Sequence, residues 1–440
     1  MPLLTSCLYE EANMTELKNQ DARGQQKKVR LYGQPDSAEA YEIRDFLNRT
    51  VVEFDWIELK SDADCERELR LPSLSNVKLP VVELPDGNQL FAPTIREIAQ
   101  HLGWVKQPKF KEYDLSIYGA GPAGLSAAVY AASEGLRTVL VERHAVGGQA
   151  GTSSLIENYM GFPDGISGAD LAERARQQAV NFGIELLLLR EGTKSEFKHN
   201  RIYTDMADGS KMIARANICA TGIEYRRLNL PNEDQFLKVG LFYGAGASEA
   251  PMCGGEHVFI VGGGNSAGQA AMYLSRYAEK VTILIRSDTL AATLSQYLVD
   301  RIINKSNIEV LFQAQVTGLT GDTSLHQIEI TNCRDGSVQK IATRRLFVCI
   351  GGAPNTEWAK DTNIIRDRAG YLVTGSDLLK EGRPPECWTL DRDPFFLETS
   401  VPGSFAAGDV RHGSVKRVAS AVGEGAMAVT FVHKYLEETA

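Results

Sequence analysis

The chain has 440 residues, of which 43% are hydrophobic and 23% are charged, and its formal net charge is −9. This length predicts two to four domains, and the composition is typical of an ordinary globular protein. The acidic balance argues against nucleic acid and anionic membranes as partners, and no apolar run reaches the ~18 residues of a membrane-spanning helix.

Residues 1–26 are expected to form a flexible tail, in which Met14 is an alternative start to Met1. The tail lacks the basic start and apolar core of a signal peptide, so we expect a cytoplasmic protein. No two of the seven cysteines have C-x-x-C spacing, which favours reduced thiols over a disulfide framework and predicts no zinc or other metal site. The cysteines are Cys7, Cys65, Cys219, Cys253, Cys333, Cys349 and Cys387.

Residues 27–104 have the pattern of a small α/β domain. The expected elements are, in order, a strand at 27–33, a loop and helix at 34–49, a strand at 54–59, a hairpin that turns at Asp86-Gly87, and a helix at 94–104 capped by Thr94. Their order resembles the thioredoxin/glutaredoxin fold, with Pro80 at the position of its cis proline. The C-x-x-C of that fold belongs at Asp36–Ala40, where Ser37 stands instead of a thiol. The resemblance implies either a docking module for a redox partner or a packing domain without chemistry.

A polar linker at 105–114 precedes the first of two glycine-rich loops. An apolar strand that starts at Leu115 enters Gly119–Gly124, a helix follows, and the next strand ends at Glu142. In this pattern the glycines let the backbone approach a pyrophosphate, the helix N-terminus supplies free N–H groups, and the acid accepts hydrogen bonds from the ribose. The segment therefore predicts a dinucleotide site.

The second loop, Gly262–Ala267, has the GxGxxA form and again lies between a strand and a helix. Its second strand ends at Arg286 instead of an acid. An arginine there suits a 2′-phosphate and favours NADPH, with NADH also open. The alternative for Arg286 is an ordinary surface charge.

Six motifs in the same order make residues 113–440 resemble the low-molecular-weight thioredoxin reductases and their thiol-free relatives, such as thioredoxin-reductase-like ferredoxin–NADP reductases. The motifs are the two loops, Gly147-Gly148-Gln149 with Glu157-Asn158, Ala220-Thr221-Gly222, Ile350-Gly351 with Pro354-Asn355-Thr356, and Ala407-Gly408-Asp409 with Arg417-Val418-Ala419. The resemblance implies an α/β fold with two nested Rossmann-like domains after the small thioredoxin-fold domain. The FAD domain would comprise 113–229 and 352–440, the NAD(P)H domain would comprise 230–351, and the protein would be a homodimer.

The resemblance also implies cofactor contacts at the positions that match the motifs. The implied FAD contacts are Gly119, Gly121, Pro122, Ala123, Gly124, Glu142, Arg143, Gly148, Gln149, Asn158, Ala220, Thr221, Gly222, Gly408, Asp409, Arg417, Val418 and Ala419. The implied NAD(P)H contacts are Gly262, Gly264, Asn265, Ser266, Arg286, Ile350 and Gly351.

The largest departure from the family is at Gly244–Ala247, where the redox C-x-x-C is expected. Hydride transfer between a nicotinamide and a flavin needs no side-chain acid or base, so few catalytic residues are expected. Tyr243 and Cys253 are the nearest candidates, each with the alternative of an ordinary core residue. His412 and Lys416, in the last loop, are expected near the flavin.

We therefore predict an FAD-dependent NAD(P)H oxidoreductase whose acceptor is not an internal disulfide: a partner protein, a quinone, another small compound or oxygen. A first alternative is a thioredoxin-disulfide reductase that uses the thiols of a partner docked on 27–104. A second is a non-enzymatic module, in which bound FAD or NADPH sets the domain orientation for a partner. The loop at 375–396 looks long for the family and is polar, so it is expected to be a surface loop, one that covers the flavin or contacts the N-terminal domain.

Overall fold

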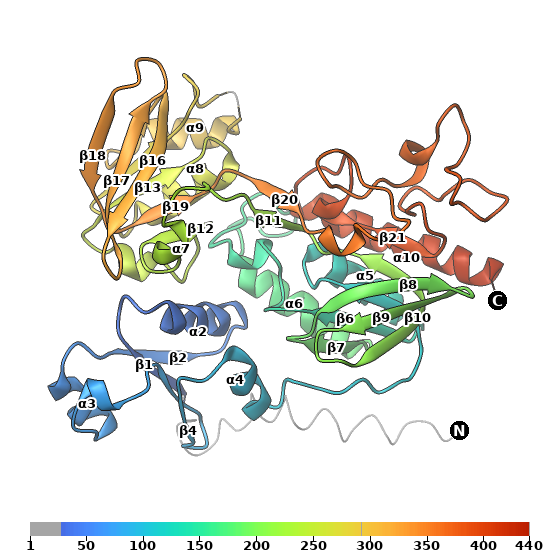
Figure 1. The fold of residues 1–440 in the computed structure, drawn as a ribbon, viewed down its shortest axis with the longest axis horizontal. Coiled ribbons are helices and arrows are strands. Elements are labelled where there is room, and N and C mark those ends of the chain that lie inside the picture. Colours follow the sequence, from blue (N-terminus) through green and yellow to red (C-terminus); the bar gives the residue numbers. More distant parts are fainter. Residues whose placement is uncertain (1–27, 292, 440) are drawn as a thin grey trace.

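The computed structural model describes residues 28–291 and 293–439, which fold into three units (Figure 1). The predicted flexible tail at 1–26 lies outside the described residues. We call the three parts the N-terminal unit (28–104), the large unit (113–225 with 352–439) and the inserted unit (226–351). Within the described ranges, no helix has both the length and the apolar character needed to cross a bilayer.

The N-terminal unit is a four-stranded sheet with three α-helices. Its elements are β1 (Val29–Gly33), α2 (Ala38–Arg49), β2 (Phe54–Glu58), α3 (Asp62–Leu69), β3 (Val81–Glu83), β4 (Gln89–Phe91) and α4 (Ile95–His101). The strand order is β2-β1-β3-β4, with β1 and β2 parallel and the other neighbours antiparallel. The Leu79–Pro80 peptide bond is cis.

Local signals account for most of this unit. The hairpin turns at Gly87, whose φ of +89° suits glycine. The predicted cap at Thr94 is confirmed: its hydroxyl accepts from Glu97 N at 3.2 Å, and Glu97 accepts from Thr94 N at 2.7 Å. Helix α3 is an addition to the predicted elements, and its sequence signal is the same kind of capping pair, Ser61 with Asp64.

The large unit has a seven-stranded sheet in the order β7-β6-β5-β10-β9-β8, with β21 paired to β10. Its strands are β5 (Tyr113–Tyr118), β6 (Thr138–Glu142), β7 (Glu185–Leu188), β8 (Gly192–Lys198), β9 (Arg201–Met206), β10 (Lys211–Cys219) and β21 (Ser404–Ala406), and its long helices are α5 (Pro122–Ser133), α6 (Gly168–Asn181) and α10 (Val418–Glu438). Helices α5 and α10 cross closely, since a Cβ on Gly425 would lie 2.1 Å from the carbonyl oxygen of Ala123. Strand β5 begins at Tyr113, two residues before the predicted start, because the backbone of Tyr113 pairs with Ala214 of β10.

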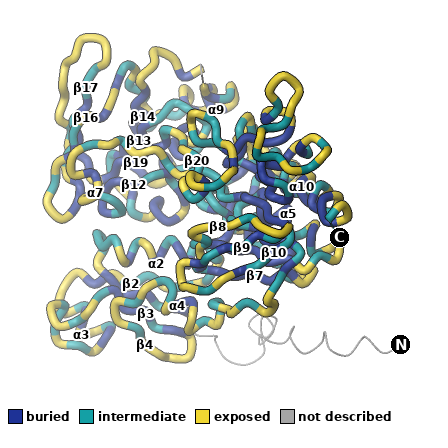
Figure 2. The backbone as a smooth tube through the Cα atoms, turned by 45° about the vertical axis from the view of Figure 1, so that its right-hand side comes forward, coloured by how far each residue is buried: buried dark blue, intermediate teal, exposed yellow. Residues whose placement is uncertain are grey.

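The inserted unit repeats the parallel arrangement on a smaller scale. Its parallel sheet has the order β12-β19-β13-β14-β15, and a separate antiparallel sheet has the order β16-β17-β18. The elements are α7 (Glu233–Phe236), β12 (Leu241–Tyr243), β13 (His257–Val261), α8 (Asn265–Leu274), β14 (Lys280–Leu284), α9 (Gln296–Ile303), β15 (Ile308–Leu311), β16 (Ala314–Gly321), β17 (Leu325–Asn332), β18 (Val338–Ala342) and β19 (Leu346–Val348). The chain enters and leaves this unit through a two-stranded ladder of β11 (Ile223–Tyr225) and β20 (Gly352–Pro354). Figure 2 shows the buried strands of the larger sheets and the exposed outer loops.

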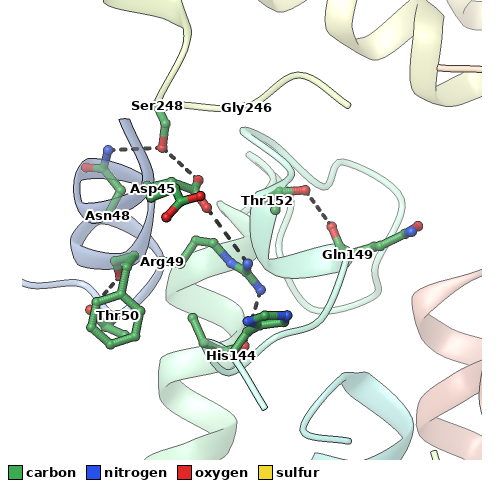
Figure 3. Close-up of polar contacts among 12 residues, drawn as sticks. Asp45, Asn48, Arg49, Thr50, His144, Gln149, Thr152, Gly246 and Ser248 are labelled. Atoms are coloured by element: carbon green, nitrogen blue, oxygen red, sulfur yellow. Dashed lines mark hydrogen bonds and ion pairs between the residues drawn. The ribbon is translucent and has the colours of Figure 1, made fainter. Parts of the chain in front are cut away.

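Helix α2 of the N-terminal unit contacts both of the other units (Figures 1 and 3). Toward the inserted unit, Asn48 Nδ2 donates to Ser248 Oγ at 3.1 Å, and Ser248 Oγ donates to Asp45 at 3.0 Å. Toward the large unit, the Arg49 guanidinium donates to the carbonyl oxygens of Ala145 and Gly148, each at 3.2 Å. The N-terminal unit is therefore docked at the junction of the two nucleotide units.

The loop at 375–396 packs on the C-terminal helix. Arg392 pairs with Glu438 of α10 at 2.7 Å, and the Phe395 ring stacks on Phe431 with 5.4 Å between centroids. The expectation that this loop covers the flavin or contacts the N-terminal unit is wrong. Aromatic and ionic contacts with α10 hold it on another face of the large unit (Figure 1).

We expect the α2 contact to be measurable by a double-mutant cycle between Asn48→Ala and Ser248→Ala. The two changes remove one shared, partly buried hydrogen bond, so their unfolding free energies should deviate from additivity by about 0.5–1.5 kcal/mol in urea denaturation. The control pairs Asn48→Ala with Ser337→Ala in the exposed β17–β18 turn, where the effects should add. Additivity in both pairs would show that α2 is not docked on Ser248.

Candidate functional site

A cavity of about 880 Å³ runs through the large unit and reaches the inserted unit. This volume lies in the range of cofactor sites. Residues of the first glycine-rich loop line it, and so do Asn265 and Ser266 of the second loop, so the space extends from the first predicted nucleotide site to the second. Two cofactors that exchange a hydride need this contiguity.

Two glycines of the first loop, Gly119 and Gly124, lie where a Cβ would overlap the backbone. Gly119 has a φ of +101°, and a Cβ there would lie 2.4 Å from the carbonyl oxygen of Ala220. A Cβ on Gly124 would lie 1.8 Å from the Gly119 carbonyl oxygen. At Gly121, by contrast, a Cβ would meet only the Gly148 Cα at 3.9 Å. The protein itself needs Gly119 and Gly124, whereas the open space beside Gly121 is what an approaching pyrophosphate needs.

Glu142 closes the predicted ribose end of this loop. Its side chain is buried and accepts from Ala120 N at 2.7 Å and from His144 N at 2.8 Å. Both bonds orient the carboxylate toward the loop. Arg143, the next residue, is instead held by Glu224 at 2.5 Å and Glu191 at 3.5 Å on the cavity rim.

Three helix N-termini face the same cavity without a side-chain cap. Helix α5 begins after Gly121, α8 after Gly264 and α10 after Arg417, and none of these N-cap residues makes a capping hydrogen bond. The first residues of all three helices line the cavity. Free N–H groups and positive dipole ends in this number favour anionic groups, such as the pyrophosphates of two dinucleotides.

Most residues predicted to bind FAD line this cavity. They are Gly119, Gly121, Pro122, Ala123, Glu142, Arg143, Gly148, Gln149, Asn158, Ala220, Thr221, Gly222, Gly408, Asp409, Arg417 and Val418. Gly124 and Ala419 lie behind the lining, where Gly124 allows the close approach of helix and strand.

The predicted NAD(P)H residues divide into two groups. Asn265 and Ser266 line the shared cavity, and the Asn265 amide is held by Ser295 at 2.9 Å. Gly262 lets the second loop pack against the end of the neighbouring strand. Its φ is +139°, and a Cβ there would lie 2.2 Å from the Cys349 carbonyl oxygen. The remaining residues, Gly264, Arg286, Ile350 and Gly351, lie outside the cavity lining. Arg286 is exposed and has no hydrogen bond or ion pair within the described ranges.

The single-residue candidates have distinct surroundings. Tyr243 donates to Glu233 and accepts from Leu228 N at 2.7 Å, so its hydroxyl is engaged inside the inserted unit. Cys253 is fully buried, and burial raises the pKa of its thiol to about 12. A thiol in this setting is scarcely ionised and is a poor nucleophile.

Of the two candidates in the loop after Asp409, Lys416 lines the cavity and His412 does not. Lys416 lines the cavity, where its ammonium donates to the Asp409 carbonyl oxygen at 2.9 Å, and burial lowers its pKa. His412 does not line the cavity and is paired with Asp367 at 2.7 Å. Burial raises the pKa of the neighbouring Asp409 carboxyl.

The cavity also has lining residues that sequence reasoning missed. Arg49 reaches it from α2 of the N-terminal unit, Tyr225 is the last residue of β11, and Trp358 lies four residues after the end of β20. None of these residues belongs to a local motif. Docking of the N-terminal unit brings Arg49 to the site, whereas Tyr225 and Trp358 follow the predicted motifs at 220–222 and 354–356 by only a few residues.

A second cavity, of about 420 Å³, lies between α2 and the segment Ala245–Glu249. Glu249 is buried, accepts from the Tyr41 hydroxyl of α2, and accepts from Gly246 N at 2.6 Å. Desolvation by burial, followed by the nearby Asp45 carboxylate, raises the pKa of Glu249.

Comparison with known proteins agrees with this geometry. A family model described as pyridine nucleotide-disulphide oxidoreductase matches residues 113–425. The chain belongs to this family. It is 32% identical over 326 residues to a thioredoxin reductase of Treponema pallidum, an overlap of 74% of this chain and 98% of the relative.

Two solved structures share the fold of the matched part. Lactococcus lactis thioredoxin reductase, in its FR conformation, is 28% identical with a TM-score of 0.65, covering 74% of this chain and 99% of that one. T. acidophilum thioredoxin reductase is 29% identical with a TM-score of 0.66, covering 75% of this chain and 100% of that one. The family match begins at residue 113, so the N-terminal unit is an addition to the shared part.

The chain is an FAD-dependent NAD(P)H oxidoreductase of Rossmann type, with FAD and NADPH as its cofactors. The glycine cradle at Gly121, the uncapped helix N-termini and the shared cavity all fit these groups. Bound together, FAD and NADPH supply the hydride chemistry. The protein supplies orientation and anion binding.

We expect Gly121→Ala and Gly124→Ala to separate cofactor binding from folding. Gly121→Ala has room in the protein and should leave the thermal midpoint of the apoprotein unchanged while greatly weakening FAD binding. Gly124→Ala overlaps the Gly119 carbonyl and should destabilise the apoprotein by about 1–3 kcal/mol. Calorimetry of the apoprotein and FAD titration by fluorescence measure the two effects. Equal loss of apoprotein stability in both variants would contradict this division.

Glu249→Gln should change the pH dependence of stability. The raised folded-state pKa stabilises the wild type below the unfolded pKa of about 4.3, and this contribution is lost as pH rises through the folded pKa. The glutamine variant has no titrating group at this position and therefore lacks this pH-dependent contribution. Its free energy of unfolding, compared with that of the wild type, should increase from pH 4 to pH 8 in urea unfolding. Glu53→Gln, on the exposed surface, is the control and should follow the wild type. A wild-type advantage that grows with pH would contradict the assignment.

Proposed function

We propose that this enzyme passes electrons from NADPH through FAD to an acceptor other than an internal disulfide. The observation that carries the proposal is the segment Gly244–Glu249, which lines the space beside the cofactor cavity and contains no cysteine. A C-x-x-C reductase needs two thiols there. A glycine, alanine and serine segment offers no group that accepts electrons.

The remaining thiols do not replace that pair. Among the described residues, the six cysteines are all free. Burial raises the pKa values of Cys219, Cys253 and Cys349 to about 12, which leaves almost no thiolate at neutral pH. The exposed Cys333 lies in the turn between β17 and β18, and no second cysteine is close to it in sequence.

We propose that the N-terminal unit is a thiol-free member of the thioredoxin-fold class, and its element order of strand, helix and strand followed by a cis proline, two strands and a helix supports this proposal. Ser37, at the position of the expected C-x-x-C, caps α2 by accepting from Ala40 N at 3.1 Å. Helix α2 covers Ser248 and Glu249, the face on which a separate thiol partner would act. This contact disfavours the alternative of a docked thioredoxin that supplies the thiols.

We propose that the donor preference for NADPH rests on Arg286. Arg286 follows the end of β14 by two residues, and its side chain is exposed and unpaired within the described ranges, so it is available to a 2′-phosphate. No hydrogen bond or ion pair among the described residues gives Arg286 a structural role.

The test is anaerobic bleaching of the bound flavin by NADPH and by NADH, followed by an assay with thioredoxin. NADPH should bleach the flavin at low concentration, and reduced enzyme should not reduce thioredoxin at enzyme-like rates. Arg286→Met should weaken NADPH roughly tenfold and leave NADH unchanged, because one charge-assisted contact is lost. Arg334→Met, on the exposed β17–β18 turn, is the control. Rapid thioredoxin reduction by the pure protein would refute the proposal.

A further inference from the structure

The second cavity adjoins the cofactor cavity. The two share part of their lining, and the shared residues are Arg49, Thr152, Ser153, Ser154, Tyr225 and Ala245. One wall comes from α2 of the N-terminal unit and the opposing wall from the segment that precedes α8. A molecule in the second cavity therefore lies next to the cofactors and inside a site that the N-terminal unit completes.

We propose that this second cavity is the acceptor site of the enzyme, that it takes a small quinone, and that Tyr41 and Glu249 supply a proton to it. The inference rests on the proposed function, because it names the acceptor that replaces the disulfide. It assigns the N-terminal unit a direct part in the reaction.

Size and wall chemistry select this class of acceptor. A volume of about 420 Å³ admits a one- or two-ring compound and excludes a protein. Aromatic and aliphatic side chains form much of the wall, among them Tyr225, Phe242, Tyr243 and Val51. Such walls suit a flat conjugated ring. No cysteine lines this cavity, so it has no group for disulfide exchange.

The polar groups match the two carbonyl oxygens of a quinone. Arg49 lines the cavity, and within the described ranges its Nη1 makes only a 3.9 Å ion pair with Asp45, which leaves this N–H group able to donate to a ligand. The Tyr41 hydroxyl and the Glu249 carboxyl also line it and are bonded to each other. When Glu249 is protonated it donates to the Tyr41 oxygen, and the Tyr41 hydroxyl proton is then free for a quinone carbonyl oxygen, with the Arg49 N–H group for the other.

Reduction of a quinone by NADPH balances in atoms and electrons. NADPH, one proton and the quinone give NADP⁺ and the hydroquinone, in which both former carbonyl oxygens carry hydrogen. NADPH provides two electrons and one hydrogen, and the second proton comes from the acid pair and is replaced from solvent. Burial keeps Glu249 protonated to higher pH than an ordinary carboxyl, which suits a proton donor.

The experiment uses the full-length holoenzyme and menadione as the probe. Binding of menadione to oxidised enzyme is measured by calorimetry, and reoxidation of NADPH-reduced enzyme is followed anaerobically by stopped flow. We expect saturable binding and a reoxidation rate that saturates with menadione. Tyr41→Phe should weaken binding about three- to tenfold, the value of one hydrogen bond. Glu249→Gln should keep the binding constant and slow the saturated rate by about 100-fold or more.

Glu39→Gln is the matched control, because Glu39 is an exposed carboxylate on the same helix, and neither it nor its partner Ser37 lines the cavity. It should leave binding and rate unchanged. If Tyr41→Phe fails to fold, Leu237→Trp fills the cavity from the inserted unit and should abolish binding. Reoxidation that stays linear in menadione, with no effect of either cavity variant, would overturn the site. A flavin that NADPH does not bleach would instead overturn the proposed function, while the calorimetric binding still tests the site.

Discussion

The contact of helix α2 with two units at once is the constraint on which the rest of the arrangement depends. Arg49 holds the carbonyl oxygen of Gly148 in the large unit, and Asn48 holds Ser248 in the inserted unit. Tyr41 adds the bond to Glu249. Because these groups lie on one rigid helix, they fix how the inserted unit faces the large unit, and they create the second cavity between them. The thiol-free segment thus lies beneath a helix that the matched part of the family does not include.

The cofactor cavity depends on a different kind of constraint, which is backbone geometry. Positive φ angles at Gly119 and Gly262 turn the chain from strand into helix, and uncapped helix N-termini leave N–H groups free for phosphates. These features need few side chains. An enzyme of this kind binds its hydride donor and its flavin through glycines and helix dipoles. The residues that contact the acceptor can therefore change without loss of cofactor binding.

The contrast between local backbone geometry and long-range packing also explains which features the sequence predicts. The glycine loops, the Thr94 cap and the Asp86-Gly87 turn are local patterns with local physical causes, and the structure places each one as expected. The placement of the loop at 375–396 on α10 and the reach of Arg49 into the cavity depend on packing between distant segments. No spacing rule contains that information, so the first was predicted wrongly and the second was missed.

The most direct test of the central claim is an anaerobic titration of the oxidised holoenzyme with NADPH, with free thiols counted before and after. An enzyme without an internal disulfide takes up two electrons per flavin, so bleaching should be complete at one equivalent of NADPH per FAD with no new thiols. A requirement for two equivalents, together with the appearance of two new thiols, would show an internal disulfide and contradict the claim.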